Sequence, residues 1–301
     1  MAVDGSSSRQ LPGPAGAGPE GRGAAEAPTG RQPTGTRGRR PSKLLGIRGT
    51  LPTRWRFAFG AIGVVAIFGI WTYAAYALNT GSALVPTPVA TWKALADLWS
   101  SGTLQTDLTA SVQRVAIGYS ISVLIGAVLG IAIGSFASIE AFFEPQIGFL
   151  RYIPATALTP LFMLWLGLGE SPKIWLIVVG TVFYNILMIA DVARNVPREL
   201  LNASYTLGAG RGKVVRKVIL PHSLPGIIDV ARINLAAAWL MLVVAELLAA
   251  QSGLAYEIIR AQRFRAVDTM FALLIVFGVI GLVSDLFLRW LRGRVAPWAR
   301  A

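Results

Sequence analysis

Several chemically useful groups are scarce in this chain of 301 residues. It has no cysteine and a single histidine, His222, and only 14% of its residues are charged. Without thiolates it can form neither a disulfide nor a sulfur-ligated metal site, and no cluster of carboxylates offers a substitute. No nucleophile stands beside a base either. We therefore expect no metal, no cofactor and no catalytic residue, and a membrane-embedded enzyme is the weakest interpretation.

Apolar residues, in contrast, make up 54% of the chain. A helix needs about 20 mostly apolar residues to cross the roughly 30 Å core of a bilayer. None of the apolar runs alternates as barrel strands do. We expect an all-α membrane protein of about six transmembrane helices, the fourth short and the fifth interrupted by charges. The expected spans are 57–78, 115–137, 145–169, 174–190, 227–250 and 270–288.

The first 50 residues have a different composition. They contain eleven glycines and six prolines, with almost no large apolar residue before Leu44. Such a segment cannot bury enough apolar surface to offset the conformational entropy lost on ordering. We expect residues 1–50 to be a disordered cytoplasmic tail and residues 51–301 to form the transmembrane domain.

Basic residues are concentrated in segments that six spans place on one side of the membrane. Residues 1–56 hold ten Lys and Arg, residues 192–226 hold six and residues 289–301 hold four, which is 20 of the 28 in the chain. The positive-inside rule makes this side, with both termini, cytoplasmic. The connection 251–268 does not fit the rule, because this topology places its three arginines outside. The net charge of +13 indicates topology and contact with the lipid bilayer, and we expect no nucleic acid partner, because no soluble basic domain is present.

A small residue recurs at every fourth position of the second span. Such a face lets helix backbones approach closely, which replaces the hydrophobic driving force that is missing in lipid. Each step turns the face by about 40°, so the groove winds round the helix and can contact more than one neighbour. We interpret it as a helix-packing face: Gly118, Ser122, Gly126, Gly130 and Gly134.

Two shorter patterns flank this span. After a rigid Pro-containing segment, Val89, Trp92, Ala96 and Trp99 recur at helical spacing. They predict a short helix, lying either on the outer membrane surface or against the bundle. In the third span, Pro160 predicts a kink.

Between the fourth and fifth spans lies a polar, basic island, residues 199–221. Glu199 to Leu207 predicts a short helix, and Gly208 can adopt the positive φ that ends it. A second, amphipathic segment follows. Pro221 and Pro225 should break the chain before the fifth span. We expect two short helices set at an angle.

This island resembles the loop by which binding-protein-dependent ABC importers dock on their ATPase. The family pattern is Glu-Ala-Ala, three residues, Gly, nine residues, Ile, one residue and Leu-Pro. The chain keeps this register with three substitutions, Asn for Glu, Ser for Ala and Val for Ile. The matching residues are Asn202, Ala203, Ser204, Gly208, Val218, Leu220 and Pro221.

The resemblance continues from about Leu84 to Trp290 and is strongest to permeases for sulfonate, nitrate and taurine. It implies a type I ABC importer permease of the bacterial inner membrane that translocates a small anion. It also implies two copies of an ATP-binding subunit, a substrate-binding protein and a second permease copy, with ATP hydrolysis on the separate subunit. Gly212-Lys213 is no phosphate-binding loop, because Val214 stands where Ser or Thr is needed.

One position of the motif departs from the family in charge. Asn202 stands where the family has glutamate, and Glu199 lies one helical turn earlier on nearly the same face. Glu199 either carries the displaced charge to the ATPase or favours the start of the helix.

Polar residues at membrane depth usually face a partner or a cavity. Asn185, Arg232 and Asn234 are therefore candidates for the translocation path, and the structural alternative for Arg232 is a pair with Asp229. Glu246 either faces the binding protein or is structural.

The spacing of Asp285 and Arg289 predicts a structural pair. The alternative function is an ion-coupled secondary transporter, which predicts broken helices in matching positions and buried coupling carboxylates, and which leaves residues 199–221 unexplained.

Overall fold

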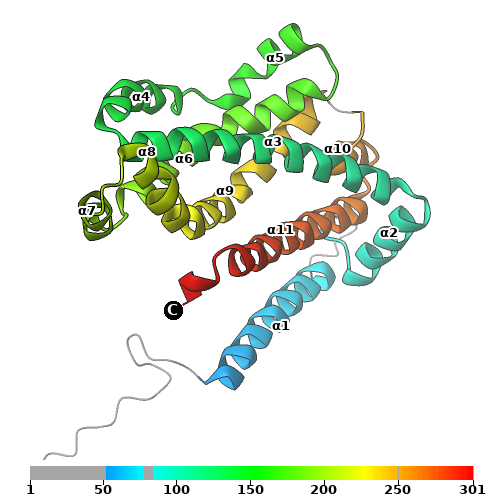
Figure 1. Ribbon diagram of the computed structural model, residues 1–301. Helices are drawn as coiled ribbons and strands as arrows, with labels where there is room; N and C mark the ends of the chain where they lie inside the picture. Colours follow the sequence, from blue (N-terminus) through cyan, green and yellow to red (C-terminus); the bar gives the residue numbers. More distant parts are fainter. Residues whose placement is uncertain (1–51, 78–83, 250, 301) are drawn as a thin grey trace, which may run out of the picture. The chain divides into compact units, whose positions relative to one another are not determined.

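The computed structural model describes residues 52–77, 84–249 and 251–300, and every element in them is helical (Figure 1). The chain divides into two compact units, residues 1–60 and 61–301, and the first is described only from residue 52. The expected tail, residues 1–50, lies outside the described residues. The packing described below is that of the second unit.

Five described helices are long and apolar enough to cross a membrane, and they correspond to all the expected spans except the third. The expected all-α bundle is confirmed, and the fourth span is longer than expected. The five are α1 (Thr53–Ala77), α3 (Thr103–Ser135), α6 (Ser171–Arg194), α9 (Leu220–Ala249) and α11 (Val267–Val295). The shorter segments are α2 (Pro88–Ser100), α4 (Ala137–Leu150), η1 (Ala155–Leu158), α5 (Thr159–Leu166), α7 (Arg198–Thr206), α8 (Arg211–Val214), η2 (Val215–Ile219), α10 (Leu254–Arg263) and η3 (Pro297–Arg300).

The third expected span is broken, so the prediction of one kinked helix over 145–169 is wrong. The run Ala137–Leu150 and the run Ala155–Leu166 are bent by 79° at the break. Pro154 explains this break, because a proline disfavours the helical conformation in the residue before it and cannot donate a hydrogen bond. Pro160 lies at the start of α5, where proline is tolerated, and so it begins a helix instead of kinking one.

The predicted break before the fifth span is also wrong, because helix continues from Arg211 to Leu248. The segment η2 is one π-helical turn, in which the N–H of Leu220 donates to the carbonyl of Val215, five residues back. A proline in an ordinary helix clashes with the carbonyl four residues before it. The wider turn directly before Pro221 relieves this clash, and the helix runs on through both prolines.

The helices α3 and α6 run side by side (Figure 1), and their contact follows the predicted small residues. A Cβ added at Gly126 would lie 2.8 Å from Cβ of Asn185, and one at Gly130 would lie 2.8 Å from the carbonyl oxygen of Ile186. Gly118 and Gly134 meet α6 in the same way, and Ser122 accepts hydrogen bonds from Thr181 and Asn185 of α6. The contact therefore extends over about 24 Å. A helix that lies obliquely on its neighbour can follow a whole i, i+4 row, which explains why one helix covers a groove that winds.

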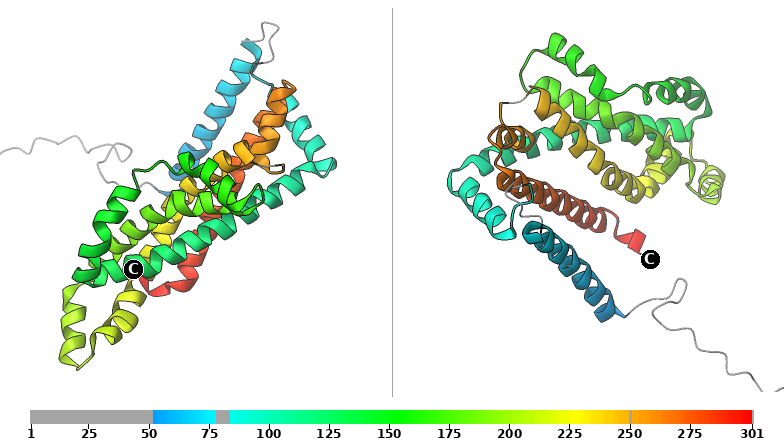
Figure 2. Two further views of the ribbon diagram at one scale, coloured as in Figure 1. Left: turned by 90° about the horizontal axis from the view of Figure 1, so that it is seen from above. Right: turned by 180° about the vertical axis from the view of Figure 1, so that it is seen from behind.

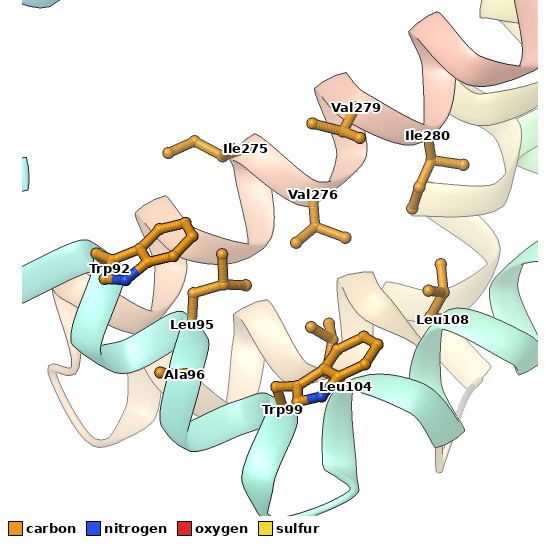
Figure 3. Close-up of a pocket in the computed structure, with 10 residues that line it drawn as sticks. All are labelled: Trp92, Leu95, Ala96, Trp99, Leu104, Leu108, Ile275, Val276, Val279 and Ile280. Atoms are coloured by element: carbon orange, nitrogen blue, oxygen red, sulfur yellow. The ribbon is translucent and has the colours of Figure 1, made fainter.

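The predicted tryptophan helix is present as α2. Its first turn is capped by Thr87, whose hydroxyl accepts the N–H of Ala90 at 3.2 Å. One face packs on the bundle, whereas Trp92 and Trp99 are 71% and 61% exposed. These indoles line an apolar pocket of about 540 Å³ whose walls come from α2, α3 and α11. Figure 3 shows the side chains around it.

We predict that the contact between α3 and α6 tolerates no added methyl group. Gly130→Ala should lower the free energy of unfolding by about 1–3 kcal/mol, the usual effect of overpacking. The matched control is Gly278→Ala on α11, where a Cβ would meet nothing within 4 Å. It should be neutral or stabilising by up to about 1 kcal/mol, because alanine favours a helix over glycine. Unfolding in mixed micelles with a denaturing detergent measures both, and equal effects would contradict the prediction.

Candidate functional site

The loop between α6 and α9 carries the sequence motif, and Gly208 forms its turn. The helix α7 matches the predicted helix to one residue at each end. Gly208 has a φ of 75°, and its N–H donates to the carbonyl of Tyr205 at 2.9 Å. The N–H of Ala209 donates to the carbonyl of Ser204 at 3.0 Å. This pair of bonds is a Schellman helix end, and it confirms the predicted positive φ of Gly208.

Apolar side chains anchor this loop in the bundle. Val196, Val214 and Ile219 are buried in one cluster with Ile131 of α3 and Ile189 of α6. The loop is thus joined on both sides of its turn to close-packed residues of two spans, and a close-packed interior transmits displacement. Leu201, Ala209, Val215 and Val218 pack against the same cluster.

The other face of the loop is exposed. Leu207 at the turn is 87% exposed. Glu199, Asn202 and Ala203 are exposed on α7, and no ion pair of Glu199 occurs in the described part of the chain. Ser204 and Pro221 are partly buried, and Leu220 is exposed. Four exposed basic residues follow the turn: Arg211, Lys213, Arg216 and Lys217.

The opposite end of the bundle holds a buried ionic cluster centred on Arg114, whose side chain is 3% exposed. Its Nε lies 2.5 Å and its Nη2 2.9 Å from the two carboxylate oxygens of Glu170. Its Nη1 donates to Oε1 of Glu246 and to the carbonyl of Ser252, both at 2.7 Å. Each guanidinium nitrogen therefore has an acceptor, as a buried charge requires.

The same cluster fixes the start of α10. The N–H of Ala255 donates to Oε2 of Glu246 at 2.9 Å, and Ser111 donates to Oε1 at 2.7 Å. The N–H of Gly253 donates to Asp107 at 2.7 Å. A Cβ at Gly253 would overlap the Glu246 carboxylate. Free N–H groups at a helix start favour negative charge, so Glu246 and Asp107 cap α10. The contacts of Glu246 are thus structural.

Glu170 precedes the span of α6 and is the most exposed member of the cluster. Its hydrogen bonds from Arg114, and then from Lys173, lower the pKa of its carboxyl from 4.5 to about 2, although partial burial opposes the change. The carboxyl therefore stays ionised at neutral pH. Its contribution to stability is fully present above about pH 4.5 and is lost as the pH falls through about 2.

The sequence reasoning missed this cluster. Arg114 lies one residue before the expected second span, and its partners are 56 and 132 residues away. No helical spacing rule connects residues that far apart. The available signal was that a charge beside an apolar run needs a partner.

Midway along the bundle, polar side chains join three helices. Ser122 of α3 accepts hydrogen bonds from Thr181 and Asn185 of α6, at 2.7 and 2.9 Å. Asn234 of α9 donates to Oδ1 of Asn185 at 2.8 Å. Asn185 is fully buried and Asn234 partly buried. The structure thus brings together two of the three candidates for the translocation path.

The third candidate, Arg232, belongs to an ionic cluster between α9 and α11. Its Nε lies 2.7 Å from Asp285, and its Nη1 lies 3.6 Å from Asp229. Asp285 also pairs with Arg289 at 2.8 Å. The predicted Asp229–Arg232 and Asp285–Arg289 pairs are confirmed. Within the described residues, no group of three or more histidine and carboxylate side chains could hold a metal ion.

The chain is similar to one class of known proteins. Residues 122–297 match the family described as "Binding-protein-dependent transport system inner membrane component". The putative aliphatic sulfonates transport permease protein SsuC of Bacillus subtilis is 34% identical, covering 82% of this chain and 90% of its own. The taurine transport system permease protein TauC of Escherichia coli is also 34% identical, covering 81% and 93%. A chain of the inward-facing MetNI methionine ABC transporter has a similar fold, with a TM-score of 0.53 at 21% identity, covering 62% of this chain and 95% of that chain.

We predict that the Arg114 cluster contributes far more to stability than an exposed pair. Arg114→Gln leaves the Glu246 carboxylate buried without its counter-charge, which should lower the unfolding free energy by about 3–5 kcal/mol. Adding Glu246→Gln should recover part of this loss, because it removes the uncompensated charge. Arg289→Gln, at a side chain 57% exposed, should cost at most about 1 kcal/mol. Detergent unfolding compares the three variants, and equal losses for Arg114→Gln and Arg289→Gln would count against the prediction.

Proposed function

This chain belongs to the family of binding-protein-dependent transport system inner membrane components, the permeases of ABC importers, and on that premise we propose that it translocates a small anion. We define the ATPase-docking loop as residues 199–221, with Glu199, Asn202, Ala203 and Leu207 on its exposed face. ATP hydrolysis then takes place on a separate subunit.

The observation that best supports this proposal is the construction of the loop. A surface that receives force from another subunit needs a fixed shape and a firm attachment. The Schellman end at Gly208 fixes the turn, and the buried Val196, Val214 and Ile219 provide the attachment. Solvent-exposed Leu207 and the basic residues beyond it remain free to contact a partner.

Motion of the docked loop passes directly into a span. The helical run Arg211–Leu248 begins in the loop and continues for about 57 Å. Along the way it carries Arg232, Asn234 and Glu246, which bond to three other parts of the bundle. A displacement at the loop therefore shifts all three polar contacts together.

Membership of this family supports a proposal about the partners. We propose two ATP-binding subunits, a second permease copy and a substrate-binding protein, in a bacterial inner membrane. The description of the family names a binding protein. An ATP-driven importer also needs a nucleotide-binding site, and Gly212-Lys213 in the docking loop is not one, because Val214 stands where Ser or Thr is needed. The second copy supplies the other half of the path.

We propose a small anion as substrate because the relatives SsuC and TauC are named for sulfonates and taurine, both of which carry a sulfonate group. Arg232 is held between α9 and α11 by its pairs with Asp229 and Asp285, two carboxylates that also pair with Arg292 and Arg289. Among the three path candidates, Asn234 is polar and partly exposed, and Asn185 holds its amide in place. Asn234 is therefore the candidate we favour for contact with the passing solute.

The docking loop and both termini should lie in the cytoplasm. The charge distribution supports this orientation. A cysteine introduced by Lys213→Cys, in a chain that has no other cysteine, should react with an impermeant thiol reagent only from the cytoplasmic side. Labelling of intact cells from outside would overturn the orientation.

Gly208→Asp should abolish ATP-driven uptake while the protein still reaches the membrane. The side chain places an uncompensated charge where the ATPase docks. Gly208→Asn is the matched control, because asparagine has nearly the same size, carries no charge and is one of the residues that tolerate this conformation. It should retain measurable uptake. Uptake into proteoliposomes measures both variants, and normal uptake by Gly208→Asp would refute the docking assignment.

A further inference from the structure

The connection between α9 and α11 carries Arg260, Arg263 and Arg265. In the proposed orientation this connection lies at the outer end of the bundle, opposite the docking loop, as Figure 2 shows for α10 and α7. Basic residues in a short outer loop oppose the positive-inside signal. They therefore need a reason other than topology.

Two of the three arginines line a pocket of about 420 Å³ on α10, next to the end of α9. Arg260 and Arg263 lie three residues apart and share a helix face, and both line this pocket. Arg265 is exposed, but it does not line the pocket. The remaining walls are mainly apolar and aromatic, including Leu247, Tyr256, Ile259 and Phe264.

The carboxylates near this pocket are already engaged. Glu246 reaches its wall, but the oxygens of Glu246 accept hydrogen bonds from Arg114, Ser111 and the N–H of Ala255. Glu257 lies 3.2 Å from Arg260. No ion pair of Arg263 occurs in residues 52–77, 84–249 and 251–300. The pocket therefore keeps a net positive charge.

We propose that this pocket is a receiving site for the substrate, which takes an organic anion with a sulfonate-type head group and a short apolar body. Arg263, with Arg260 beside it, binds the head group, because a guanidinium presents paired donors that match the oxygens of such an anion. Tyr256, Ile259 and Phe264 contact the apolar body. This proposal rests on the proposed function, to which it adds the chemical class of the substrate and the place where the substrate enters.

The phosphate group of an anionic lipid offers similar chemistry to the same arginines. A lipid phosphate comes from the membrane, whereas the substrate anion comes from solution. Changing the lipid composition therefore distinguishes the two ligands. Nanodiscs made only of phosphatidylcholine contain no anionic lipid, whereas nanodiscs with added phosphatidylglycerol do.

The test uses the assembled permease–ATPase complex in phosphatidylcholine nanodiscs, without binding protein, and butanesulfonate as the probe. Calorimetric titration should show saturable binding. Arg263→Gln should weaken it at least about tenfold, because hydrogen bonds to charged groups are the strong ones. Arg263→Lys should fall in between. Butyltrimethylammonium, which has an apolar body but the opposite charge, should not compete.

The matched control is Arg265→Gln, which removes the same charge two residues away and outside the pocket. It should bind butanesulfonate as the wild type does. Equal weakening by Arg263→Gln and Arg265→Gln would mean a diffuse surface charge, and the site would be rejected. A lower melting temperature for Arg263→Gln alone would make Arg263 a structural residue at the end of α10, which also overturns the site.

Two further outcomes separate the sources and the proposals. If butanesulfonate binds only weakly in phosphatidylcholine while phosphatidylglycerol raises the melting temperature of the wild type but not of Arg263→Gln, the pocket binds lipid and the substrate site is wrong. If uptake depends on ATP and on Gly208 but butanesulfonate does not bind, the receiving site fails and the permease function stands. Failure of the permease to assemble with any ATPase would instead defeat the proposed function.

Discussion

In lipid, two apolar helices gain little by contact unless their backbones approach closely, and the bundle depends on one such approach. Along α3, glycine or serine at every fourth residue lets α6 lie against the helix backbone. The polar bonds of Ser122 with Thr181 and Asn185 need this closeness, because short side chains must reach across. The apolar cluster under the docking loop also includes Ile131 and Ile189 from the same two helices. The docking loop and the candidates for the translocation path thus both depend on the contact between α3 and α6.

The helix α9 connects the paired helices α3 and α6 to both ends of the bundle. Its helical run begins in the docking loop, bonds to α6 through Asn234 and to α11 through Arg232, and reaches Arg114 through Glu246. Polar contacts in the bilayer are few. Breaking one leaves an unpaired polar group, which is costly in lipid, so each contact disfavours other arrangements of the helices. The run is therefore held at defined points along its length, which is what a helix that transmits motion requires.

Local signals in the sequence predicted local structure well. The helix α7, the positive φ of Gly208 and the i, i+3 and i, i+4 ion pairs of α9 and α11 all follow from neighbouring residues. Features that depend on distant residues did not follow. The partners of Arg114 come from two other segments, and only the folded chain brings them together. The third expected span is broken at Pro154, which disfavours helix in the residue before it, although the run around it is apolar throughout.

The helix continues through Pro221, and this continuity gives the spacing between Gly208 and Pro221 a structural reason. Proline was expected to end the helix, but the π-helical turn of η2 lies directly before it and removes the clash. Gly208 ends the first helix, and Pro221 marks the place where the second enters the bundle, so the residues between them set the length of the arm that joins turn to span. An inserted residue would rotate this arm by about 100°, and Val214 and Ile219 would leave their buried cluster. The fixed spacing therefore keeps one face of the arm on α3 and α6 while the other remains exposed.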